Sequence, residues 1–353
     1  MNIVSIVGAR PQFIKSAPVS KAIADAGHSE YKIHTGQHYD YGMSQVFFDE
    51  LGLPEPSINL GLGSGTHAQQ TGNMLIVIET VLLSQNPDIV LVYGDTNSTL
   101  AGALAAVKLD IKLAHIEAGL RSYNRQMPEE HNRVLTDHCS DLLFCPTQIA
   151  VDNLDREGIQ KGVHLVGDTM YDAVLMFGEV AKQKSHILLS LGLKPKGYLL
   201  ATIHRANNTD HVEILSAILY AFQQVEELII FPIHPRTIKA INSANLIIPD
   251  NIKIIDPVGY LDMLILEKNA RLILTDSGGI QKEAYFFEVP CLTLRSETEW
   301  VETEQSGWNH LVGTDPDLII KAVQKHVWPK SAAIQLFGDG HAGRKIVSLL
   351  KKN

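Results

Sequence analysis

The sequence predicts an α/β protein with two Rossmann-like, doubly wound parallel-sheet domains that face a cleft. Short apolar runs alternate with helical stretches, and this alternation stops and restarts near the middle of the chain. Polar residues follow one apolar run after another, as expected where ligands bind at the carboxyl ends of strands. The 353 residues are enough for a domain over 1–170, a second over 171–335, and a C-terminal helix within 336–353 that packs back on the first.

Short apolar runs bounded by Gly, Pro or polar residues predict the strands. They are residues 3–7, 32–35, 89–92, 112–116, 142–145, 163–166, 198–202, 228–232, 252–255, 272–274 and 289–294. Apolar residues at helical spacing predict helices that begin at Pro11 and cover 66–83, 99–108, 129–139, 212–225, 261–269, 280–287, 319–327 and 343–350. The polar, poorly patterned stretch 185–196 is expected to lie near the domain boundary.

The composition is ordinary for a globular protein and argues against several classes. With 45% hydrophobic residues, 20% charged residues and a net charge of −9, the chain is a poor candidate for a general nucleic-acid binder. No apolar run reaches the ~18 residues of a membrane helix, and the apolar N-terminus is typical of a strand, not of a signal peptide. The cysteines at 139, 145 and 291 have no metal-ligand or disulfide spacing. We expect a cytoplasmic protein with no membrane partner.

One stretch, residues 272–302, concentrates the features of a ligand site. A short apolar run precedes Ser277, Gly278 and Gly279, which allow a tight turn, and a helix follows. A helix that starts directly after two glycines presents N–H groups and the positive end of its dipole to an anion. Glu283 lies about one turn further on, where a carboxylate suits a sugar diol. The next predicted strand leads to Arg295, so two consecutive strands bring polar groups to one edge.

Ionisable side chains also follow the other predicted strands. They are Arg10, Lys15, Asp95, Glu117, Arg121 and Glu129 in the first half, and His204, Arg205, His234 and Arg236 in the second. Basic groups near a helix N-terminus suit phosphates, and carboxylates with a histidine suit proton transfer. Helix capping or a surface position explains any single one of these residues equally well. The presence of the whole set at the carboxyl ends of the strands favours a functional site. The chain lacks a P-loop, a Gly-x-Gly-x-x-Gly motif, a nucleophile elbow and a metal-binding His/Cys pair.

These motifs resemble one family nearly end to end. The chain is similar to the non-hydrolysing UDP-N-acetylglucosamine 2-epimerases, which share the two-domain architecture of GT-B glycosyltransferases. The matching motifs are Gly8-Ala9-Arg10-Pro11, Gly36-Gln37-His38, Tyr93-Gly94-Asp95-Thr96, His115-Ile116-Glu117-Ala118-Gly119-Leu120-Arg121, Pro128-Glu129-Glu130, Asn132-Arg133, His204-Arg205, Thr275-Asp276-Ser277-Gly278-Gly279 and Gln281-Lys282-Glu283-Ala284.

The resemblance implies interconversion of UDP-GlcNAc and UDP-ManNAc by inversion at C2. Family members proceed through anti elimination of UDP to a 2-acetamidoglucal, followed by re-addition of UDP. The positions that match acid/base and substrate-contacting residues are Asp95, Glu117, Glu129 and His204, and which of them takes the proton stays open. The positions implied in binding UDP and the sugar are Arg10, Lys15, Arg133, His234, Ser277, Gly278, Gly279, Glu283 and Arg295, with Glu283 at the ribose. No metal or redox cofactor is implied, whereas domain closure and a homodimer are.

Several positions depart from the commonest family pattern. The usual Thr-Glu-Arg-Pro-Glu is Thr298-Glu299-Trp300-Val301-Glu302, so Trp300 replaces a nucleotide-contacting arginine. Gln12 stands where glutamate is common, and His-Arg-Arg-Glu is His204-Arg205-Ala206-Asn207. The loop at Tyr39-Asp40 differs from that of members with a regulatory second UDP-GlcNAc site. Similar substitutions occur in the subgroup that epimerises UDP-2,3-diacetamido-2,3-dideoxy-glucuronate for O-antigen synthesis, so both substrates stay open.

Three other classes compete with an epimerase. A GT-B glycosyltransferase would use the same UDP site but would need an open acceptor groove. A hydrolysing epimerase would keep the elimination and admit water, and a UDP-sugar sensor would need no acid/base groups. A transferase or a sensor does not require three carboxylates and a histidine for proton transfer, so these residues favour the epimerase.

Overall fold

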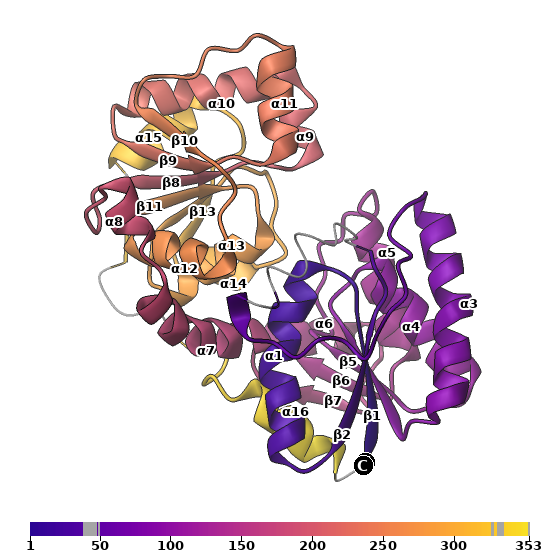
Figure 1. The fold of residues 1–353 in the computed structure, drawn as a ribbon. Helices are drawn as coiled ribbons and strands as arrows, with labels where there is room; N and C mark the ends of the chain where they lie inside the picture. The colour runs from indigo at the N-terminus through magenta and orange to yellow at the C-terminus, as the bar shows by residue number, and fades with distance from the viewer. Residues whose placement is uncertain (38–47, 49, 326–327, 330–334, 352–353) are drawn as a thin grey trace. The chain divides into compact units, whose positions relative to one another are not determined.

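The computed structural model describes residues 1–37, 48, 50–325, 328–329 and 335–351 (Figure 1). The chain divides into two compact units, residues 1–176 with 335–353, and residues 177–334. The division falls inside helix α7 (Thr169–Lys184), between Met176 and Phe177, whereas the sequence placed it after residue 170. The polar stretch 185–196 contains a short helix, α8 (Ile187–Leu191), and belongs to the second unit.

The first unit is built on a parallel sheet with the strand order β3-β2-β1-β4-β5-β6-β7. The strands are β1 (Asn2–Val7), β2 (Ser29–His34), β3 (Ile58–Asn59), β4 (Ile89–Tyr93), β5 (Leu113–Ile116), β6 (Leu142–Cys145) and β7 (Val163–Leu165). The order reverses between β1 and β4, which is the switch point at which open α/β sheets bind ligands.

Helices cover both faces of this sheet (Figure 1). They are α1 (Arg10–Asp25), α3 (His67–Gln85), α4 (Asn97–Lys108), α5 (Pro128–Cys139), α6 (Gln148–Arg156) and α16 (Ala342–Leu350). Buried residues of α3 and α4, such as Ile78 and Ala103, form one core with Val4 and Ile6 of β1. On the other face α16 packs on α1 so closely that a Cβ at Gly343 would lie 2.9 Å from the Pro18 carbonyl.

The second unit repeats the same topology with the strand order β10-β9-β8-β11-β12-β13. Its strands are β8 (Leu199–Thr202), β9 (Ile229–Pro232), β10 (Ile252–Ile255), β11 (Leu272–Thr275), β12 (Cys291–Thr293) and β13 (Asn309–Leu311), all paired in parallel. Its further helices are α9 (Ala206–Thr209), α10 (Val212–Val225), α11 (Pro235–Ser243), α12 (Tyr260–Asn269), α13 (Gly278–Phe286), α14 (Val301–Gln305) and α15 (Pro316–Lys325). The switch point lies between β8 and β11.

The predicted strands are present, although their ends shift. The strand expected over 289–294 shortens to β12, because Pro290 has no N–H to donate to a ladder. His234 precedes α11 and caps its start, where the His234 side chain accepts a hydrogen bond from the Arg236 N–H. The motif residue His38, the loop at Tyr39-Asp40 and the end of the helix predicted over 319–327 lie outside the described residues. Among described residues, no helix is long and apolar enough to cross a membrane.

Candidate active site

Gln12 ties the ends of β1 and β4 together at the switch point of the first unit. Its Oε1 accepts hydrogen bonds from the Gly8 N–H at 2.7 Å and the Ala9 N–H at 3.0 Å. Its Nε2 donates to the Tyr93 carbonyl at 2.6 Å. An ionised glutamate could not donate to that carbonyl, so the departure from the commoner glutamate suits the partners that surround Gln12 here.

Asp95 follows β4 and is held by two residues of α5. Arg133 Nη2 donates to Asp95 Oδ2 at 2.5 Å, and Asn132 Nδ2 donates to the Asp95 carbonyl at 2.9 Å. The Arg133 side chain is 4% exposed, whereas that of Asp95 is 29% exposed. A buried guanidinium therefore fixes the position of a carboxylate that stays open on one side, as a proton-transfer group must.

Glu117 follows β5 and holds a φ of 75°, in the left-handed region. This conformation costs a residue other than glycine about 1–2 kcal/mol. It is maintained because the Glu117 N–H donates to the Phe144 carbonyl at 3.1 Å. The carboxylate forms an ion pair with Lys15 of α1. A Cβ added at Gly94 would lie 3.4 Å from Glu117 Oε2, so this ion pair lies close to the end of β4, at the residue that precedes Asp95.

A buried network supports the loop that carries Glu117. Asp137 lies 2.6 Å from His115 Nδ1 and accepts hydrogen bonds from the Gly119 N–H at 3.1 Å and Arg121 Nη1 at 2.7 Å. Burial alone would raise the pKa of the Asp137 carboxyl, but the neighbouring His115 and Arg121 hold this pKa below its usual value. Arg121 also contacts Glu157 and is buried, so its role in this structure is to hold the loop.

The remaining predicted residues of the first unit lie at helix starts. Arg10 is the first residue of α1 and is exposed. Glu129 is exposed near the start of α5, while the next residue, Glu130, is buried and accepts hydrogen bonds from the Ser122 N–H at 2.9 Å and the Tyr123 N–H at 2.9 Å. The structure thus brings Lys15, Asp95, Glu117 and Arg133 together and leaves Arg10 and Glu129 at the surface.

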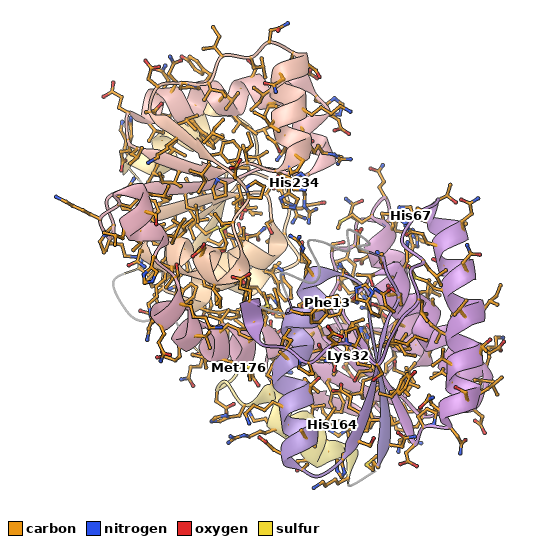
Figure 2. The ribbon with its side chains drawn as sticks, in the orientation of Figure 1. Phe13, Lys32, His67, His164, Met176 and His234 are labelled. Carbon is orange, nitrogen blue, oxygen red and sulfur yellow. The ribbon has the colours of Figure 1, made fainter. Side chains whose placement is uncertain are left out.

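In the second unit, His204 and Asp276 meet at the switch point between β8 and β11. His204 Nδ1 lies 3.1 Å from Asp276 Oδ1. The ring centroids of His204 and His234 are 5.9 Å apart. Figure 2 shows His234 on the second unit, where it caps α11. The two predicted histidines are therefore neighbours, and His204 has a carboxylate partner.

The glycines at the start of α13 do not form the predicted turn before the helix. Gly278 and Gly279 are its first two residues, and neither has a positive φ. A Cβ at Gly278 would overlap Glu299 Oε1, so the Glu299 carboxylate would have to move to make room for it. Glu299 is held in turn by Arg295 Nη1 at 3.1 Å and lies 3.9 Å from Arg205. A helix of nine residues thus begins with N–H groups that have no partner within the helix, beside two arginines.

Trp300, which stands where the family pattern has arginine, is buried against the same helix. The Lys282 ammonium of α13 lies 3.8 Å from the centroid of the Trp300 ring. The Trp300 Nε1 atom is 3.3 Å from the point that a Cβ on Gly278 would occupy. A cation–π contact between two buried side chains stabilises their positions by about 2 kcal/mol. Trp300 therefore shapes the surroundings of the α13 N-terminus.

Glu283 is 4% exposed, and the Tyr260 hydroxyl donates to its Oε1 at 2.8 Å. Glu267 of α12 is fully buried beside it. Burial, and then the neighbouring Glu283 carboxylate, raise the pKa of Glu267 well above its usual value. The Glu283 carboxylate, which is the predicted ribose-binding group, is therefore oriented by neighbouring side chains of α12.

This shift makes stability depend on pH. Because the folded-state pKa of Glu267 is raised, the folded protein keeps a proton that the unfolded chain has lost above about pH 4, and stability falls as pH rises from there towards the folded-state pKa. Glu267→Gln should raise the free energy of unfolding at neutral pH by about 1–3 kcal/mol and have little effect below pH 4, as measured by denaturant unfolding. Glu304→Gln, at an exposed position, is the control and should change little. A destabilised Glu267→Gln at neutral pH would contradict this.

Sequence reasoning missed Gln12, Glu130 and Asp276 as members of the site. Asp276 lies two positions after the predicted strand 272–274, as His204 does after 198–202, so the rule that found His204 would have found it as well. Gln12 carried no such signal, because Tyr93 becomes its neighbour only through the sheet order. Glu130 bonds to backbone N–H groups of the nearby residues Ser122 and Tyr123, which lie in a segment without a periodic pattern. Among described residues, no group of three or more His, Cys, Asp or Glu side chains could hold a metal ion.

Two doubly wound parallel sheets, each with charged groups at its switch point, define the GT-B class of fold. The family described as UDP-N-acetylglucosamine 2-epimerase matches residues 21–351. The chain belongs to this family.

Three relatives are similar over almost the whole chain. It is 55% identical to a "UDP-N-acetylglucosamine 2-epimerase homolog" of Methanococcus maripaludis, covering 99% of each chain. It is 48% identical to a "UDP-2,3-diacetamido-2,3-dideoxy-D-glucuronate 2-epimerase" of Pseudomonas aeruginosa, covering 100% of each. The crystal structure of Methanocaldococcus jannaschii UDP-GlcNAc 2-epimerase in complex with UDP-GlcNAc and UDP is 47% identical, with a TM-score of 0.91 and 100% coverage of both chains.

Proposed function

We propose that this protein is a non-hydrolysing epimerase that interconverts UDP-GlcNAc and UDP-ManNAc. In the proposed reaction, a side-chain base takes the C2 proton while the bond between C1 and the UDP oxygen breaks, and the electron pair of that bond leaves with UDP. A C1–C2 double bond forms, which makes the 2-acetamidoglucal. A proton then returns to the other face of C2 as a UDP oxygen attacks C1, so atoms and charge balance without a cofactor.

The observation that carries the proposal is the pair of open acid/base groups at the two switch points. Asp95 follows β4 in the first unit and is oriented by Arg133, and His204 follows β8 in the second and is oriented by Asp276. Glu117 adds a carboxylate close to Gly94, the residue that precedes Asp95. A transferase or a sensor has no need for such groups, whereas elimination and re-addition at C2 use them in both directions.

The α13 N-terminus is the proposed site of the diphosphate. Its first N–H groups and the positive end of the helix dipole attract an anion, and Arg295 and Arg205 lie beside Glu299 at the same helix end. We assign Glu283 to the ribose, as in the family pattern. Lys15, Arg10, Arg133 and His234 remain proposed contacts of UDP or the sugar.

One observation favours the second substrate, UDP-2,3-diacetamido-2,3-dideoxy-glucuronate. Trp300 replaces the arginine of the family pattern and packs on Lys282 beside Gly278, and the Pseudomonas relative is named for this substrate. We propose that the reaction type is the same for both sugars. Cytoplasmic location and assembly as a homodimer are also proposed on the family resemblance.

A panel of sugar nucleotides decides between these candidates. UDP-GlcNAc, UDP-ManNAc and the diacetamido-uronate would each be incubated in deuterated buffer and followed by NMR. We expect deuterium at C2 of the true substrate and of its epimer, with the UDP-sugar intact. Free sugar with UDP would indicate a hydrolysing enzyme, and the absence of deuterium from all three would indicate a transferase or a sensor.

Gly279→Ala tests the diphosphate site without disturbing the fold. A Cβ at Gly279 meets only Ser277 Oγ, at 3.8 Å, and alanine favours a helix by about 0.5–1 kcal/mol, so stability should be kept or raised. We expect UDP affinity, measured by calorimetry, to fall about tenfold if the diphosphate contacts this N-terminus, since one tenfold step is 1.4 kcal/mol. Gly178→Ala, where a Cβ meets nothing within 4 Å, is the control. Unchanged UDP affinity in Gly279→Ala would place the diphosphate elsewhere.

A further inference from the structure

We propose that Asp276 is a positioning residue that fixes the tautomer and orientation of His204, so that the Nε2 atom of His204 exchanges the proton with the substrate. This inference rests on the proposed function of His204 and extends it to a residue that does not itself touch the sugar. Asp276 is 0% exposed in its side chain, whereas the His204 side chain is 41% exposed.

The topology of the sheet explains why these two side chains meet. Thr202 of β8 pairs in register with Thr275 of β11, and their hydroxyl oxygens are 2.6 Å apart. The next residues along each strand therefore leave the sheet side by side. Asp276 comes directly after Thr275, and His204 lies two residues after Thr202. Because the two strands flank the switch point, the pair lies at the edge where such sheets bind ligands.

The Asp276 carboxylate is surrounded by donors. It accepts hydrogen bonds from the His204 N–H at 3.1 Å and from the Arg205 N–H at 3.0 Å, both to Oδ2. Asn208 Nδ2 donates to Oδ2 at 3.1 Å, and the His204 ring approaches Oδ1 at 3.1 Å. Burial alone would raise the pKa of Asp276, but hydrogen bonding to His204 and the backbone N–H groups lowers it. These neighbours all act as hydrogen-bond donors to Asp276. Both oxygens of a carboxylate can accept such bonds, whereas only one end of an amide can.

The Asp276 carboxylate determines which nitrogen of the His204 ring carries the hydrogen. An acceptor at Oδ1 requires a hydrogen on His204 Nδ1, and a neutral ring then carries its lone pair on Nε2. That atom can take a proton, while the Nδ1–H···Asp276 contact stays in place throughout. The same division of roles between a buried carboxylate and a histidine keeps the imidazole in the required tautomer in hydrolase triads.

Asp276→Asn is the test. Asparagine can still accept the hydrogen bonds at Oδ2, but its amide group would then face His204 Nδ1 and favour the opposite tautomer, with the hydrogen on Nε2. We expect C2 exchange to slow by at least about 100-fold while UDP affinity stays within about threefold. The ring ¹⁵N signals of His204 should report the Nδ1–H form in the unmodified protein and the Nε2–H form in the variant.

A double variant separates positioning from a structural role. His204→Ala/Asp276→Asn should be no slower than His204→Ala, because Asp276 acts through the ring. If the double variant were much slower, or if Asp276→Asn kept its exchange rate, the positioning role would be overturned. Should Asp276→Asn not fold, an Nε2–H ring in the unmodified protein would overturn it as well. Full exchange by His204→Ala would instead overturn the proposed function of His204 itself.

Discussion

Asp95→Asn should slow C2 exchange by about 10²–10⁴-fold, the range in which a positioned acid or base contributes. The substitution keeps the shape of the side chain and the carbonyl that accepts the Asn132 hydrogen bond. It removes the charge that faces Arg133 and the ability to take a proton. Deuterium incorporation at C2, followed by NMR under saturating UDP-sugar, measures the loss.

The fold of Asp95→Asn should survive, because Arg133 keeps its second partner, Glu130, at 3.0 Å. We expect its free energy of unfolding to change by about 1 kcal/mol, within the range of a single lost ion pair at a partly exposed carboxylate. Asp110→Asn, an aspartate at an exposed turn, is the matched control and should keep full exchange. Full exchange by Asp95→Asn would remove Asp95 from the acid/base set.

Glu117→Gln is the second substitution with a large expected effect. It removes a carboxylate close to Gly94 and breaks the ion pair with Lys15, whose side chain is 14% exposed. We expect exchange to fall by about 10²–10⁴-fold. Stability should fall by about 3–5 kcal/mol, because a mostly buried ammonium loses its partner. Exchange assays and denaturant unfolding measure the two effects separately.

Lys15→Met combined with Glu117→Gln distinguishes the chemical role of Glu117 from its structural role. Removing both charges should restore most of the lost stability, since no unpaired charge remains buried. Exchange should stay low, because the carboxylate is still missing. A double variant that regained exchange together with stability would show that Glu117 only supports the fold.

Most strands of the two sheets and part of the candidate site could be predicted from the sequence. Parallel strands buried on both faces appear as continuous apolar runs, such as β4 and β8, and Asp95 and His204 each lie two positions after the end of such a strand. Elements too short to show a period, such as the two-residue β3 and the three-residue β13, were missed. The C-terminal helix, α16, packs on α1, as the close approach of Gly343 to the Pro18 carbonyl shows.

The partners of the site residues could not be predicted, because they depend on tertiary packing. The Arg205 N–H and Asp276 are 71 positions apart and meet only because β8 lies next to β11. Gly278 was interpreted as a turn residue, yet its missing Cβ makes room for Glu299, which lies 21 positions away by number. The burial of Glu283 under Tyr260 likewise follows from the packing of α12 on α13 and from no local pattern.

The central claim is that both the C2–H bond and the C1–oxygen bond break and re-form within one bound complex. It is tested most directly with UDP-GlcNAc that carries ¹⁸O in the bridge between C1 and the β-phosphorus, incubated in deuterated buffer. We predict deuterium at C2 and movement of ¹⁸O into the non-bridging positions of the β-phosphate, read from ¹H and ³¹P NMR of the same sample. Deuterium at C2 with the ¹⁸O still confined to the bridge would show that UDP never leaves, and would contradict the account.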